Sequence, residues 1–73
     1  DGNNITHSKP DPEVFLKAAE KLGESPSNCA VVEDSMSGII AAKAGGFYAV
    51  AISDAKKSPI ADLRIEKLSN ILH

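Results

Sequence analysis

Two short, uninterrupted apolar runs, at residues 29–32 (CAVV) and 47–52 (FYAVAI), constrain the fold of this chain more than any other feature. Both are short and partly β-branched or aromatic, which is typical of strands covered on both faces. Between them, Ser35 is a favoured N-cap and Gly45-Gly46 a favoured helix end, so a helix of roughly ten residues is predicted. A strand, a helix and a strand with short connections predict a right-handed parallel crossover in a layered α/β sheet. The apolar pattern of this helix is formed by Met36, Ile39, Ile40 and Ala44.

An earlier helix is predicted from a Pro-Asp-Pro turn. Asp11 is a good N-cap, Pro12 suits the first helical position, and Gly23 suits the residue after the last turn. After the second apolar run the pattern weakens, and it predicts three small elements. These are a short turn or helix from Ser58-Pro59, an edge strand at 63–65 and a last helical turn or two at 67–72.

The chain has 73 residues, of which 42% are hydrophobic and 25% charged, with a formal net charge of -2. A unit of this size buries only about 60% of its unfolded surface. Because about three strands cannot cover both faces of a sheet, and because the chain starts at Asp1, we expect residues 1–73 to be the C-terminal part of one Rossmann-like core domain. The rest of the parent chain would be its partner.

Composition argues against two classes of partner. The sequence has no basic stripe and few aromatic residues, so no nucleic-acid binding is expected. No apolar run approaches the roughly 20 residues of a membrane span, so no membrane partner is expected. The single cysteine, Cys29, begins an apolar run and fits a buried thiol in a reducing compartment, so a cytoplasmic protein is predicted.

Glu33 and Asp34 follow the first predicted strand directly. In open parallel sheets ligands bind beyond the carboxyl ends of the strands. Two adjacent carboxylates there repel unless a cation or protons neutralise them, and Mg²⁺ suits such hard oxygen ligands. The alternative is structural: Asp34 could be an N-cap and Glu33 a solvated loop residue.

Lys9 is the second candidate site residue. It precedes a stiff Pro-Asp-Pro turn, where its ammonium could neutralise phosphate or carboxylate charge. It could equally be a solvated lysine before a helix start. Ser35 is interpreted as a cap rather than a nucleophile, because no histidine is near it in sequence to act as its base. His7 is interpreted at most as a residue at the rim of the site, and no role is assigned to His73.

The segments SKPDPEVF and CAVVEDSMSGIIAAKAGG together resemble the last third of haloacid dehalogenase superfamily phosphotransferases, and within them the beta-phosphoglucomutase-like branch. The resemblance covers residues 1–52, with a softer likeness in the tail. It implies a three-layer α/β core with a parallel sheet and Mg²⁺ as cofactor. It also implies a phosphorylated sugar or small phosphometabolite as substrate.

The resemblance also implies residue roles. Lys9 would balance charge between a nucleophilic aspartate and the transferring phosphoryl group, and Glu33 and Asp34 would hold Mg²⁺ directly or through water. Ser8 and Ser35 would support the phosphate or the metal by hydrogen bonding. The expected reaction converts β-glucose 1-phosphate to glucose 6-phosphate through an aspartyl-phosphate.

The family's D-x-D-x-x-[TV] nucleophile loop and its cap domain do not occur in these 73 residues. The chain alone is therefore predicted to be inactive. Two alternatives stay open: a small-metabolite phosphatase of the same superfamily, and a non-catalytic α/β piece that needs a partner chain.

Overall fold

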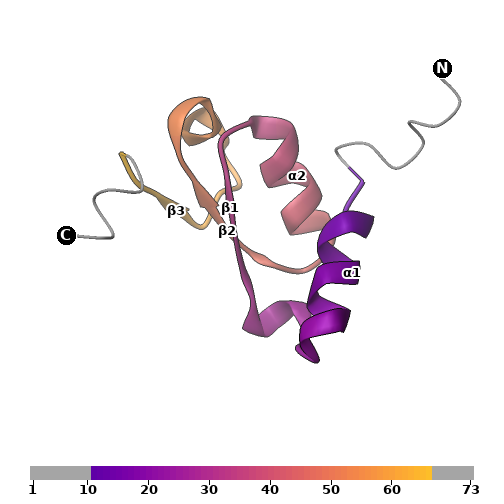
Figure 1. Ribbon diagram of the computed structural model, residues 1–73. Helices are drawn as coiled ribbons and strands as arrows, with labels where there is room; N and C mark the ends of the chain where they lie inside the picture. Colours follow the sequence, from indigo (N-terminus) through magenta and orange to yellow (C-terminus); the bar gives the residue numbers. More distant parts are fainter. Residues whose placement is uncertain (1–10, 67–73) are drawn as a thin grey trace, which may run out of the picture.

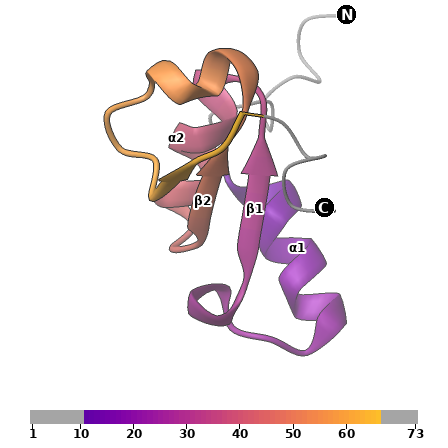
Figure 2. The same ribbon diagram turned by 90° about the vertical axis from the view of Figure 1, so that its left-hand side faces the viewer.

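The computed structural model describes residues 11–66, which form a parallel three-stranded sheet of order β1-β2-β3 with two helices (Figure 1). Both helices lie on the same side of β1 and β2, behind the strands in Figure 2. The predicted parallel α/β arrangement is confirmed. None of the described helices is long and apolar enough to cross a membrane. The elements are α1 (Glu13–Leu22), the short helix η2 (Pro26–Asn28), β1 (Ala30–Glu33), α2 (Met36–Ala44), β2 (Tyr48–Ala51), the short helix η3 (Ser53–Lys57) and β3 (Leu63–Arg64).

The C-terminal end of α1 follows the predicted signal, but the start lies one residue later than predicted, because Pro12 and not Asp11 is the N-cap and the helix begins at Glu13. The carboxylate of Asp11 accepts a hydrogen bond from the backbone N–H of Glu13 at 2.8 Å. At the other end Gly23 has a φ of 74°, and the N–H of Glu24 donates to the carbonyl of Ala19 at 3.1 Å. This bond, together with one from the N–H of Gly23 into the last turn, forms a Schellman motif, which explains why a glycine ends the helix.

The boundaries of α2 are also as predicted, but its apolar pattern is not. The Ser35 hydroxyl caps the helix, and Ile39 is fully buried against the sheet. Met36 and Ile40, in contrast, are 41% and 45% exposed. The buried side of α2 consists mainly of small residues, which let the helix lie close to the alanines of β2. Apolar residues thus lie on both the buried and the exposed side of α2, and this pattern is typical of a helix that is buried on more than one side.

The core lies between the helices and the sheet. Phe15 of α1 meets Phe47, just before β2, edge to face, with 6.0 Å between the ring centroids. Phe47 is 2% exposed, and the alanines Ala49 and Ala51 are fully buried beneath α2. Apolar burial on this one side of the sheet is the main favourable contribution to the stability of the described part.

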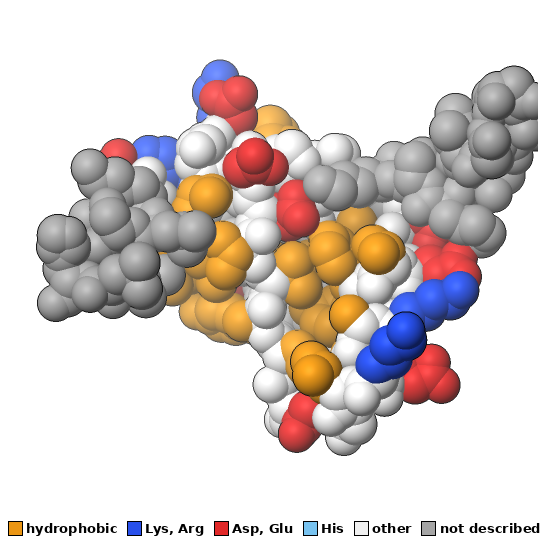
Figure 3. Space-filling view, in the orientation of Figure 1, with side chains coloured by type: hydrophobic (Ala, Val, Ile, Leu, Met, Phe, Trp, Pro, Cys, Tyr) orange, Lys and Arg blue, Asp and Glu red, His pale blue; other side chains and the backbone are white. Residues whose placement is uncertain are grey.

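The opposite face of the sheet is apolar and exposed along β1 and β3, while Val50 of β2 between them is only 6% exposed. Val32 pairs with Val50, which in turn pairs with Leu63, so these three residues form a row across the sheet. Val32 and Leu63 are 41% and 44% exposed. The prediction that the first apolar run is covered on both faces is therefore not met within residues 11–66, because α1 and α2 lie on one face. Further apolar side chains reach the surface on the helical side (Figure 3).

The C-terminal part contains one short helix that was not predicted. This helix, η3, begins at Ser53, which has a φ of 53°. Ser58 is 2% exposed, and its N–H donates to the carbonyl of Ala55 at 2.9 Å, so it ends η3. The turn predicted from Ser58-Pro59 is confirmed, because residues 59–60 form a turn and the hydroxyl of Ser58 accepts a hydrogen bond from the N–H of Ile60 at 3.3 Å. The predicted edge strand is confirmed as β3, which pairs parallel to β2. The helical turns predicted at 67–72 lie outside the described residues.

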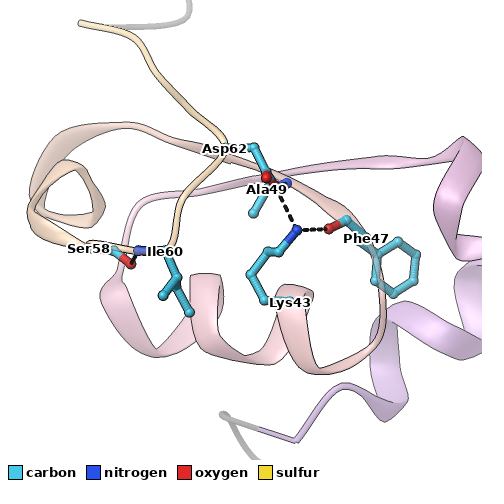
Figure 4. A network of polar contacts seen from close by, with 6 residues as sticks. All are labelled: Lys43, Phe47, Ala49, Ser58, Ile60 and Asp62. Atoms are coloured by element: carbon cyan, nitrogen blue, oxygen red, sulfur yellow. Dashed lines mark hydrogen bonds and ion pairs between the residues drawn. The ribbon is translucent and has the colours of Figure 1, made fainter.

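A polar network joins α2, β2 and the segment before β3 (Figure 4). The ammonium of Lys43 donates to the carbonyl of Phe47 at 2.9 Å and contacts the carboxylate of Asp62 at 2.8 Å. The same Asp62 oxygen accepts the N–H of Ala49 at 2.7 Å. One carboxylate therefore joins the segment before β3 to α2 and to β2, which lie 19 and 13 residues earlier in the sequence.

Candidate functional site

The candidate site lies at the carboxyl end of β1. Glu33 is the last residue of β1, and its carbonyl accepts a hydrogen bond from the N–H of Ile52, just after β2, at 2.9 Å. Because the two strands run parallel, they end at the same edge, and Asp34 and Ser53 follow these ends. This is the location at which parallel α/β sheets bind their ligands.

The side chain of Glu33 lies under the first turn of α2. Glu33 is half-buried, and strand alternation places it on the same side of the sheet as Val31, which packs on the core. A methyl group added to Gly38 would lie 1.9 Å from Oε1 of Glu33 and 2.4 Å from its carboxyl carbon. The carboxylate therefore occupies the space that a side chain at residue 38 would need.

Asp34 and Ser35 connect the strand to the helix. Asp34 is exposed, and Ser35 is half-buried with an extended backbone. The Oγ of Ser35 accepts a hydrogen bond from the N–H of Gly38 at 3.1 Å, so the predicted capping role is confirmed. The cap fixes the backbone immediately after the acidic pair. A supporting role of Ser35 toward a metal stays a prediction.

Lys9 and Ser8 lie outside the described residues, so their predicted meeting with Glu33 and Asp34 stays a prediction. Within residues 11–66, no group of three or more His, Cys, Asp or Glu side chains is arranged to hold a metal ion. The described part thus supplies an acidic pair and not a complete ligand set.

The acidic pair fits Mg²⁺ as part of a larger set. Carboxylate oxygens are its preferred protein ligands, and it typically takes one or two of them while water and substrate phosphate fill the other positions. The side chain of Glu33 lies in a space that is free only because residue 38 is a glycine. Asp34, which is exposed, follows Glu33 directly. The donor chemistry of the pair and the position of the Glu33 carboxylate beside Gly38 both fit such a site.

Sequence reasoning missed Gly38. The signal was available, because a glycine inside a helix is about 1 kcal/mol less favourable than alanine and needs a reason. The structure supplies that reason in the position of the Glu33 side chain.

Comparison with known proteins identifies the family of this chain. Residues 1–46 match the model of haloacid dehalogenase-like hydrolases. The chain belongs to the haloacid dehalogenase-like hydrolase family. It is 38% identical over 71 residues to a beta-phosphoglucomutase of Bacillus subtilis, an alignment that covers 97% of this chain and 31% of that protein. It is also 35% identical over 72 residues to hexitol phosphatase B of Escherichia coli, covering 92% of this chain and 32% of the phosphatase.

A solved structure agrees with this family assignment. The crystal structure of a beta-phosphoglucomutase from Clostridium difficile matches 99% of this chain with a TM-score of 0.76 at 28% identity, and the match spans 34% of that protein. The described α/β arrangement is thus that of a haloacid dehalogenase-like core. The chain spans about a third of the length of these relatives. By their names, these relatives of the haloacid dehalogenase-like family are phosphomutases and a phosphatase.

Proposed function

We propose that this chain is the C-terminal part of a Mg²⁺-dependent sugar-phosphate phosphotransferase, and that the activity is that of a beta-phosphoglucomutase. The position of Glu33 and Asp34 at the carboxyl end of β1 carries the proposal. The similarity to the Bacillus subtilis enzyme, which extends over 97% of the chain, supports it.

Each candidate residue has a role in this proposal. Glu33 and Asp34 hold Mg²⁺, directly or through water, and the capped start of α2 fixes the backbone that carries them. Bound Mg²⁺ supplies positive charge for the phosphoryl oxygens of the substrate. Lys9 supplies a second positive charge near the phosphoryl group. Ser8 and Ser35 hydrogen-bond to the phosphate or to groups around the metal.

The remaining catalytic parts would come from the parent chain. The sequence contains no D-x-D-x-x-[TV] loop that could provide a nucleophile. We therefore expect the 73-residue chain alone to show no turnover. The single cysteine and ordinary composition of the chain support a cytoplasmic location.

A small-metabolite phosphatase is the second candidate function. The 35% identity to hexitol phosphatase B over 92% of the chain favours it. The two reactions differ in which group accepts the phosphoryl group: a second sugar phosphate in the mutase and water in the phosphatase. In both, the acidic pair and Lys9 would act in the same way.

The intact protein should be assayed with β-glucose 1-phosphate in the presence of Mg²⁺. Formation of glucose 6-phosphate without release of inorganic phosphate supports the mutase. Release of inorganic phosphate from this substrate or from hexitol phosphates supports the phosphatase. If neither occurs and the upstream sequence has no D-x-D-x-x-[TV] loop, the chain is a non-catalytic α/β module.

A further inference from the structure

The backbone of α2 does not require a glycine at residue 38. Within the described residues, positive φ angles at glycine occur at Gly23 and Gly46. Gly38 lies inside the first turn of α2, where alanine has the better helix propensity. The reason for a glycine here must therefore be space and not conformation.

That space is taken by one side chain. Three atoms of Glu33, namely Oε1, the carboxyl carbon and Cγ, lie 1.9, 2.4 and 2.8 Å from the position of a Cβ at Gly38. Contacts below 3.0 Å cannot be tolerated, so any larger residue must displace the Glu33 side chain or push α2 away from the sheet. Gly38 is buried and Ile39 beside it is fully buried, so the helix has little freedom to move.

We propose that Gly38 is a positioning residue, whose missing side chain lets the Glu33 carboxylate lie under the first turn of α2 and so fixes where it meets the metal. This inference rests on the proposed function, because it assumes that Glu33 and Asp34 hold Mg²⁺. It adds the residue that decides where the first of these two carboxylates can lie.

Gly45 offers a matched control on the same helix. A methyl group added there would lie 2.8 Å from Phe47 and 3.0 Å from Pro12. The backbone of Gly45 is right-handed helical, so alanine is conformationally allowed. Gly45→Ala thus adds the same methyl group and disturbs the packing, but against Phe47 and Pro12 and not against Glu33.

The test is the affinity of the intact protein for Mg²⁺ alone, measured by isothermal titration calorimetry, with thermal unfolding as a measure of folding. We expect Gly38→Ala to weaken Mg²⁺ binding by about 10- to 100-fold, as is typical when a group that orients a metal ligand is disturbed. Gly45→Ala should lower the melting temperature without changing the affinity. In a Glu33→Gln background, Gly38→Ala should cause no further loss of affinity.

Asp34→Asn separates this inference from the proposed function. If Asp34→Asn leaves Mg²⁺ binding unchanged, the metal site itself is refuted, and the positioning role with it. If Asp34→Asn weakens binding but Gly38→Ala behaves like Gly45→Ala, only the positioning role is refuted. Should Gly38→Ala fail to fold, Glu33→Asp provides the test. This variant shifts the carboxylate by one methylene group and should also weaken Mg²⁺ binding. Unchanged affinity for Mg²⁺ in Glu33→Asp would overturn the inference.

Discussion

Asp62 pairs with Ala49 twice, once through its backbone and once through its side chain. The N–H of Asp62 donates to the carbonyl of Ala49 at 2.9 Å, and the carboxylate of Asp62 accepts the N–H of Ala49 at 2.7 Å. The side chain thus extends the pairing of β2 with β3, which itself consists of only two residue pairs. The ammonium of Lys43 forms an ion pair with the same oxygen.

This arrangement predicts a pH dependence of stability. The hydrogen bond from Lys43, and then that from the N–H of Ala49, hold the pKa of Asp62 below its ordinary value of 3.8. A carboxyl group whose pKa is lowered by folding contributes stability that is complete above its unfolded pKa and is lost as the pH falls through the folded value. Asp62→Asn should therefore lower the melting temperature at pH 7, and the difference from the wild type should shrink as the pH falls below 3.8.

Thermal unfolding of the intact protein across this pH range measures the effect. Glu20→Gln, which removes an exposed carboxylate from α1, is the matched control and should leave the melting temperature nearly unchanged. If the melting temperatures of Asp62→Asn and the wild type differ by the same amount from pH 7 to pH 2, the ionised carboxylate does not contribute to stability.

Local sequence signals predicted the helix ends well, because the contacts that end a helix lie within a few residues of each other. Ser35 and Gly23 cap helices through contacts to their own neighbourhood, and both positions were correct. The buried side of α2 was not predicted, because burial depends on what packs against the helix. Ile39 and Ile40 are both apolar, and only the position of the sheet decides which of them is buried.

For the candidate site, sequence reasoning found the acidic pair but not the geometry around it. The location of Glu33 and Asp34 follows from the end of an apolar run. The contact between Glu33 and Gly38 depends on how closely α2 approaches β1, and no sequence pattern encodes this distance directly. Asp62 was missed for a similar reason, since its partner Lys43 is 19 residues away.

The cap of α2 is expected to contribute measurably to stability. Ser35→Ala removes the acceptor for the N–H of Gly38 and should lower the free energy of unfolding of the intact protein by about 1 kcal/mol. Ser35→Thr, which keeps the hydroxyl, should lose much less. Ser27→Ala, at an exposed serine of η2 away from this cap, is the control and should change the free energy by less than about 0.5 kcal/mol. Equal losses for Ser35→Ala and Ser27→Ala in denaturant unfolding would refute the cap.

The partly exposed apolar face of the sheet should make the 73-residue chain associate with itself. Val32 and Leu63 lie in one apolar row with Val50 and are 41% and 44% exposed. Exposed apolar patches of this kind promote association. The double variant Val32→Thr and Leu63→Thr should shift the chain toward the monomer in sedimentation velocity.

The control for this experiment is Val14→Thr on α1. Val14 is 59% exposed but lies on a helix behind the sheet, so the same kind of change there should leave association largely as it is. If Val14→Thr reduces association as much as the double variant does, the sheet face is not the surface that associates.

Asp34→Asn tests the metal site through two opposite effects. In the intact protein the variant should reduce turnover by orders of magnitude and weaken its dependence on Mg²⁺, because a proposed carboxylate ligand is lost. Without metal it should be slightly more stable, by less than about 1 kcal/mol, because the repulsion between Glu33 and Asp34 is relieved. Asp54→Asn, an equal change of charge just after β2, is the control for both measurements. Wild-type turnover in Asp34→Asn at limiting Mg²⁺ would remove Asp34 from the site, whereas loss of turnover in both variants would point to a general effect of charge at this edge of the sheet.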